Sequence, residues 1–139
     1  MTMHLPAITA TYLAVLALLY AALGLRVSRL RRANRAGFGD GGNAELRGAI
    51  RAHAHFAEYV PIIALMVALL ETSGLGALTV HLLMAALLVA RLLHPIGMYA
   101  SSSGSLQFRL GRVGGMTLTI MVMVASALLI LSRISLTLF

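Results

Sequence analysis

Four long apolar stretches divide the sequence, and short polar or glycine-rich segments separate them. The membrane-spanning segments that this pattern predicts are residues 5–25, 48–71, 77–98 and 112–136. Each stretch is long enough to cross a hydrocarbon core about 30 Å thick as a helix. A helix satisfies its backbone polar groups internally, which a segment surrounded by lipid requires. The pattern therefore predicts an all-α integral membrane protein, a four-helix transmembrane bundle in one domain over residues 1–139.

Capping and turn residues place the ends of the predicted helices. Asn43 is a suitable N-cap for a second helix over Ala44–Glu71, because its side-chain oxygen can accept a hydrogen bond from the first turn. Pro61 lies inside that helix, where it is expected to cause a kink that neighbouring helices can tolerate. A loop rich in Ser and Gly is expected from Tyr99 to Gln107, and the last helix from Leu106 to Leu136.

Composition supports a membrane protein and excludes several classes of site. Apolar residues make up 60% of the chain and charged residues 11%, whereas soluble domains average about 25% charged. The chain has no cysteine, which excludes disulfides, thiolate metal sites and a cysteine nucleophile. No nucleic-acid partner is expected, because the basic residues lie between apolar spans without interleaved aromatic residues.

The positive charge is carried by arginine alone and is unevenly distributed. Seven arginines lie in the connector after the first span or at the start of the second helix: Arg26, Arg29, Arg31, Arg32, Arg35, Arg47 and Arg51. Three more flank the third loop, Arg91, Arg109 and Arg112, and Arg133 lies toward the opposite side. The positive-inside rule then predicts both termini outside and both basic loops in the cytoplasm. Most connector arginines are interpreted as this topology signal in contact with lipid phosphates; the alternative is that one or two point inward and bind an anion.

The densest polar chemistry lies in Arg51–Pro61. On a helix, Arg51, His55 and Glu58 follow a spacing that brings them to one face. A carboxylate beside a membrane span is costly unless a partner neutralises it, so a structural Arg51–Glu58 ion pair is one interpretation. The predicted topology also brings arginines of the third and fourth helices to the same depth. One glutamate cannot neutralise them all, and a surplus of cations in a poorly hydrated place should bind an anion.

A metal site is not expected. His53 and His55 are two residues apart, so they do not share a helix face. His55 and Glu58 do share one, but a third ligand would have to come from another helix, as His94 would. A single pair of ligands does not make a metal site.

Three motifs resemble the MAPEG family, membrane-associated proteins in eicosanoid and glutathione metabolism. They are Arg51-x-His53-x-x-Phe56-x-Glu58-Tyr59-x-Pro61, Arg91-x-x-His94-x-x-Gly97-x-Tyr99, and Arg109-Leu-Gly-Arg112-Val-Gly. The first is the most specific, and the resemblance covers nearly the whole chain. The family contains microsomal glutathione transferases, leukotriene C synthase and the lipoxygenase-activating protein.

This resemblance implies a homotrimer of four-helix subunits with glutathione sites at the subunit interfaces, near the cytoplasmic side. It implies a site composed of Arg51, Glu58 and Tyr59, joined by Arg29 or Arg31, with Arg91, His94 and Tyr99 on the wall of the third helix. Either Arg109 or Arg112 would stabilise the glutathione thiolate. The site includes His55, where the family usually has Asn. The synthases have tyrosine where this chain has Met98, which places Tyr99 about 100° further around a helix.

The leading functional hypothesis is a membrane-bound glutathione transferase. It would conjugate glutathione to hydrophobic electrophiles that enter from the lipid bilayer, with lipid-hydroperoxide reduction as a second activity. The alternative is a non-catalytic lipid-binding or scaffold protein of the same fold. A small multidrug exporter also has four spans, but its acidic residue is expected in the first span, which here has none.

Overall fold

The computed structural model describes residues 5–99 and 104–138, and it confirms the predicted bundle of four long helices. The helices are α1 (Ala7–Ala33), α2 (Ala44–Thr72), α3 (Ala77–Met98) and a last helix that begins as the π-helical segment η1 (Phe108–Gly114) and continues as α4 (Gly115–Leu138). Each is long and apolar enough to cross a membrane. The last helix therefore differs from the expected uniform α-helix in its first two turns.

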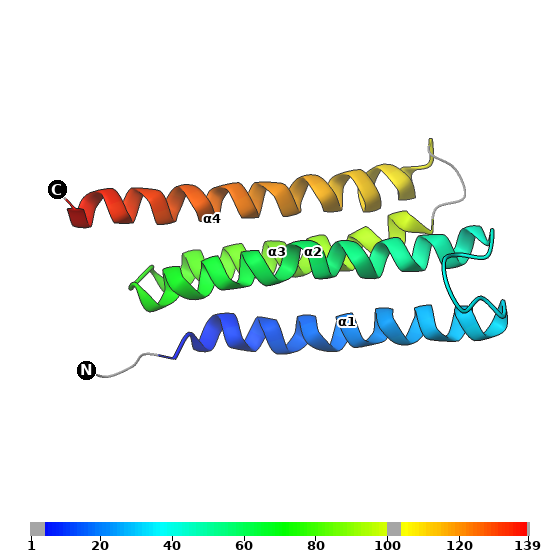
Figure 1. Ribbon diagram of the computed structural model, residues 1–139. Coiled ribbons are helices and arrows are strands. Elements are labelled where there is room, and N and C mark those ends of the chain that lie inside the picture. The colour runs from blue at the N-terminus through cyan, green and yellow to red at the C-terminus, as the bar shows by residue number, and fades with distance from the viewer. Residues whose placement is uncertain (1–4, 100–103, 139) are drawn as a thin grey trace.

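Successive helices run in opposite directions, and different segments of the chain form the two ends of the bundle (Figure 1). The start of α1 and the end of α4 lie at one end, and the loop over residues 34–43 and the start of η1 lie at the other. Large apolar side chains fill the centre of the bundle: Leu16, Leu23, Phe56, Val60, Ile63, Val67, Leu70, Val80, Leu83, Met84, Leu87 and Val122. Many other leucines face outward, as expected of helices whose outer faces contact lipid.

The basic connector is mostly helical, which the sequence pattern did not predict. Helix α1 continues through its arginines to Ala33, since arginine is a good helix former and no Gly or Pro interrupts the stretch. Asn34 ends the helix by donating from its side chain to the Leu30 carbonyl at 2.8 Å. Asn43 is confirmed as the N-cap of α2, because its side chain accepts from the Leu46 N–H. The predicted loop from Tyr99 to Gln107 includes residues 100–103, which lie outside the described residues.

A carboxylate from α2 caps the start of α1 at the end of the bundle that carries the termini. Helix α1 has no side-chain cap of its own at Pro6. Glu71 supplies one, accepting from the backbone N–H groups of Ile8 and Thr9 at 2.9 and 2.8 Å and from the Thr9 hydroxyl at 2.6 Å. Free N–H groups at a helix start need such acceptors, especially where little water reaches them.

Replacing Glu71 by Ala should therefore destabilise the bundle. We expect a loss of about 0.5–2 kcal/mol, the usual effect of removing an N-cap acceptor. Thr72→Ala is the matched control, because the exposed Thr72 hydroxyl bonds only to carbonyls of its own helix among the described residues. Thermal unfolding in detergent measures both variants, and equal Tm values would contradict the capping role of Glu71.

Glycines bring α3 and the last helix into backbone contact. A Cβ atom placed on Gly97 would overlap the backbone of Arg112, and one placed on Gly111 would overlap the backbone of Gly97. At Gly115 a Cβ would lie 3.0 Å from the Ala90 carbonyl oxygen. Small residues permit such close helix approach in membranes. This contact fixes the position of η1, and with it the position of the arginines that η1 carries.

Candidate functional site

A cavity of about 380 Å³ lies at the arginine-rich end of the bundle, between α2, α3 and the last helix. Its lining is Arg51, His55, His94, Arg112, Val113, Met116 and Thr117. Two guanidinium groups and two imidazoles thus face one space, with apolar side chains on one side. In the described part of the chain, no three His, Asp or Glu side chains come together where they could hold a metal ion. The lining suits an anion.

Helix α2 forms one wall through residues one turn apart. Arg51 Nη2 donates to His55 Nε2 at 2.9 Å. Because a guanidinium can only donate, this bond places the His55 ring proton on Nδ1. That nitrogen lies 3.9 Å from Glu58 Oε2, and the Tyr59 ring stacks on the His55 ring with centroids 6.0 Å apart. The Glu58 side chain is 51% exposed and lies beside the cavity rather than in its lining.

Helix α3 contributes two buried polar side chains behind this wall. Arg91 is 1% exposed and His94 is 2% exposed, and the His94 ring lies 5.0 Å from the His55 ring. Arg91 donates to the His55 carbonyl at 3.4 Å and to the Thr119 hydroxyl. Its Nε atom has no hydrogen-bond partner among the described residues, and none of their ion pairs involves Arg91. A buried guanidinium without a carboxylate leaves positive charge for an anion to neutralise.

The π-helical segment η1 separates Arg112 from Arg109. In an α-helix, residues three apart lie on nearly the same face. Here Arg112 faces the cavity, whereas Arg109 lines a neighbouring groove among Leu106, Leu110, Leu118 and Met121. Gly111 and Gly114 lie within this segment, and π-turns are frequent at functional sites. The structure thus distinguishes two arginines that the sequence left as alternatives.

Three residues assigned to the site by resemblance lie elsewhere in the single chain. Arg29 is exposed on α1, and Arg31 donates to the Gly37 carbonyl at 3.3 Å. The Tyr99 ring lies under the Arg26 guanidinium, 3.8 Å from ring centroid to Cζ. Burial raises the pKa of the Tyr99 hydroxyl above its ordinary value. In the single chain these side chains are not part of the cavity lining, and their role at a glutathione site stays a prediction.

Thr119 is the polar partner that sequence reasoning missed. It is fully buried, accepts from Arg91 and donates to the Gly115 carbonyl at 2.8 Å. A signal for it was present, since Gly111, Gly115 and Thr119 continue one series of small residues at intervals of four. This spacing places a hydroxyl on the face of the last helix that meets α3.

Comparison with known proteins supports the family resemblance found in the sequence motifs. The model of the MAPEG family matches residues 9–132. Inner membrane protein YecN of Escherichia coli strain K12 is 37% identical over 92 residues, which is 66% of this chain and 70% of YecN. YecN of Escherichia coli O6:H1 matches to the same extent. No solved structure matches the chain.

Proposed function

Because this chain belongs to the MAPEG family, we propose that it is a membrane-bound glutathione transferase that conjugates glutathione to hydrophobic electrophiles. The protein itself is a multi-pass integral membrane protein, as its four spans and its similarity to an inner membrane protein indicate. Reduction of lipid hydroperoxides by the same thiol is the second activity that we propose.

The observation that supports this proposal is the surplus of positive charge around one cavity. Arg51 and Arg112 line it, and the buried Arg91 lies behind His55. The lining contains no carboxylate. Glutathione carries two carboxylates and a thiol that can ionise, so it supplies the negative charge that the cavity lacks. The orphaned Nε of Arg91 fits the same conclusion, since an anion nearby offsets the cost of burying that charge.

The chemistry that this site can support is activation of a thiol. A thiol is a weak nucleophile until it ionises, and a neighbouring guanidinium favours the thiolate where water is scarce. Arg112 would do this, while Arg51 would bind a carboxylate; both line the cavity. The sulfur would then attack the electrophilic carbon, forming a C–S bond as the leaving group departs with its electron pair. Apolar lining from Val113 and Met116 would admit an electrophile from the bilayer.

Assembly as a homotrimer would complete the site. Glu58 and Tyr59 lie at the edge of the cavity, so a neighbouring subunit could bring such groups to a shared site. We also propose that both termini lie outside and both basic loops lie in the cytoplasm. The structure groups the charges as this topology requires, because the ends of α1 and α3 and the starts of α2 and η1 lie together (Figure 1).

Calorimetry of the detergent-purified protein tests the proposal. Glutathione should bind and release a proton at neutral pH, whereas an S-alkylated analogue should bind without releasing one. Arg51→Ala should weaken binding of both by about 2–5 kcal/mol, because a ligand carboxylate loses its charged partner. Arg47→Ala is the matched control one turn earlier on α2, where Arg47 pairs with Asp40. Absence of binding together with absence of turnover of an aromatic halide would contradict the proposal.

A second candidate function is a non-catalytic lipid-binding or scaffold protein of the same fold. An apolar groove of about 560 Å³ between α1 and α2 favours it. Small side chains leave this groove open, among them Ala10, Ala17, Ala57, Ala64 and Ala68. If glutathione binds without proton release and no electrophile is turned over, this candidate replaces the enzyme.

A further inference from the structure

The loop between α1 and α2 presents an aromatic side chain beside unpaired positive charges. Phe38 is 96% exposed. Arg29, Arg32 and Arg35 precede it and are also exposed. We call residues 34–43 the Phe38 loop. Neither the packing of the bundle nor the cavity accounts for a fully exposed phenylalanine at this place.

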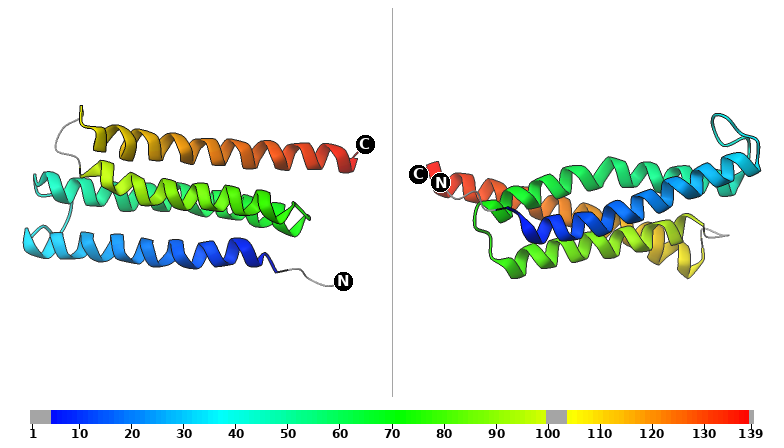
Figure 2. Two further views of the ribbon diagram at one scale, coloured as in Figure 1. Left: turned by 180° about the vertical axis from the view of Figure 1, so that it is seen from behind. Right: turned by 90° about the horizontal axis from the view of Figure 1, so that it is seen from below.

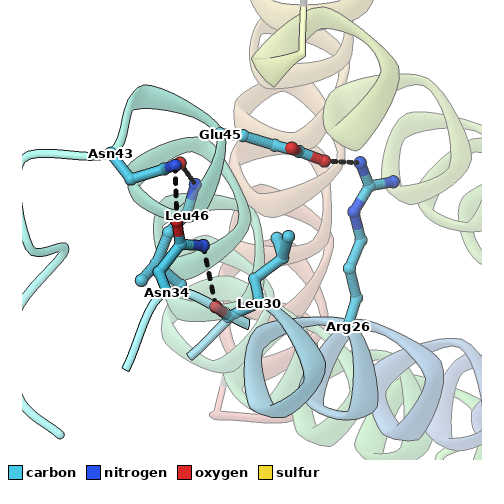
Figure 3. Close-up of polar contacts among 6 residues, drawn as sticks. All are labelled: Arg26, Leu30, Asn34, Asn43, Glu45 and Leu46. Carbon is cyan, nitrogen blue, oxygen red and sulfur yellow. Dashed lines mark hydrogen bonds and ion pairs between the residues drawn. The ribbon is translucent and has the colours of Figure 1, made fainter. Parts of the chain in front are cut away.

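The carboxylates nearest to this loop in sequence are already paired. Asp40 accepts from Arg47, and Glu45 Oε1 lies 3.2 Å from Arg26 Nη2 (Figure 3). The hydrogen bond from Arg47 holds the pKa of Asp40 below its ordinary value, so this pair stays ionised at neutral pH. Within residues 5–99 and 104–138, no side-chain hydrogen bond or ion pair joins Arg29, Arg32 or Arg35 to another group. Three positive charges therefore remain for a partner outside the chain.

Hydrogen bonds at the base of the Phe38 loop hold its shape. Asn43 Nδ2 donates to Asn34 Oδ1 at 2.9 Å, and so joins the end of α1 to the start of α2 (Figure 3). Within the loop, the Gly42 N–H donates to Asp40 Oδ1 at 3.0 Å. The backbone reverses through left-handed conformations at Arg35, with φ 51°, and at three glycines. The loop is thus closed at its base while the Phe38 ring has no intramolecular packing to lose.

The depth of the loop relative to the bilayer follows from the length of α1. Its 27 residues extend about 40 Å at 1.5 Å per residue, whereas the hydrocarbon core is about 30 Å thick. If Leu25 ends the apolar part, Arg29 and Arg32 lie roughly 6 and 10 Å beyond it, in and just outside the headgroup layer. The loop also stands out to one side of the bundle in the right-hand view of Figure 2. It therefore extends over the membrane surface beside the protein.

We propose that Phe38, Arg29, Arg32 and Arg35 form a surface that binds the anionic phospholipids of the adjacent leaflet. The guanidinium groups would take the lipid phosphates, since arginine makes bidentate bonds with phosphate. The Phe38 ring would enter the boundary between headgroups and acyl chains, where aromatic side chains anchor membrane proteins. Charge complementarity and the height of the loop favour a lipid surface over an acidic soluble protein.

The absence of tryptophan from the chain gives a clean test, because Phe38→Trp creates a single fluorescent reporter at the loop. This variant is reconstituted into vesicles of equal parts phosphatidylglycerol and phosphatidylcholine, in which either the one lipid or the other is brominated. We expect blue-shifted emission, and quenching about twofold stronger by the anionic lipid, because the basic side chains concentrate it. Replacing Arg29, Arg32 and Arg35 together by Gln should remove the preference, and so should high salt, which screens exposed charges.

Leu5→Trp at the opposite end of the bundle is the matched control, because Leu5 is exposed and no arginine lies near it in sequence. Its quenching should be equal by the two lipids. Emission of a water-exposed indole at position 38 in both vesicles would overturn the proposal and assign the loop to a soluble partner. Equal quenching at position 38 by the two lipids would also overturn it. These readouts do not involve glutathione, so they are independent of the proposed activity.

Discussion

Arg112→Gln is expected to lower the kcat of glutathione conjugation about 100-fold, the usual loss when one charge-stabilising group is removed from a reacting site. Arg112 is the arginine of η1 that faces the cavity. A neutral amide stabilises a thiolate much less than a guanidinium does, so the proton release on glutathione binding should also fall sharply. Binding itself should weaken far less than turnover, which identifies an interaction made with the reacting sulfur.

Arg109→Gln is the matched control for this prediction. Arg109 belongs to the same π-helical segment but lies in the neighbouring groove. Its replacement should leave kcat and proton release close to those of the unchanged protein. Stopped-flow thiolate absorbance and steady-state kinetics measure both effects. An equal loss in the two variants would show that the orientation imposed by η1 does not decide which arginine acts.

Gly97→Ala is expected to destabilise the protein by at least the ~1–3 kcal/mol that is typical of overpacking a core. The added methyl group would overlap the backbone of Arg112, which cannot move aside as a flexible side chain can. Gly111→Ala should have a similar effect, because it meets the backbone of Gly97 from the other side. Both variants should also lose glutathione binding, since separating α3 from η1 opens the cavity.

Gly114→Ala is the matched control within η1. A Cβ there makes ordinary contact, 3.6 Å from the Arg109 carbonyl oxygen. Alanine favours helix over glycine by up to about 1 kcal/mol, so this variant should be neutral or slightly more stable. Thermal unfolding in detergent distinguishes the variants. A Tm for Gly97→Ala equal to that of Gly114→Ala would contradict the backbone contact between α3 and η1.

Much of the fold could be read from local patterns. The apolar stretches gave four helices, and Asn43 marked the start of α2 because an N-cap depends on its own side chain and the next turn. The first helix was predicted to end at Leu25, eight residues before its observed end at Ala33. The charged residues after Leu25 were interpreted as a connector, although their helix propensity favours continuing the helix. The spacing also placed Arg51 and His55 on one face of α2, because one helix determines that arrangement, and the two side chains are hydrogen-bonded in the structure.

The candidate site was only partly predictable for a physical reason. Contacts between helices depend on how the helices rotate and slide against each other, which local spacing does not specify. Thr119 reaches Arg91 only because α3 and the last helix approach at glycines. Tyr99 packs against Arg26 instead of entering the cavity because its direction is set at the end of α3. Spacing within one helix can place Thr119 on the face that meets α3, but it does not specify the contact with Arg91 or the direction of Tyr99.

The sequence by itself determined that this protein crosses the membrane four times, belongs to the MAPEG family and gathers most of its arginines at one end of the bundle. Those properties depend on hydropathy, on short motifs and on the order of segments, all of which are local. Only the tertiary structure decided that Arg112 and not Arg109 faces the cavity. The reason is that a π-helical register, held by the Gly97–Gly111 contact, sets the direction of each side chain in η1.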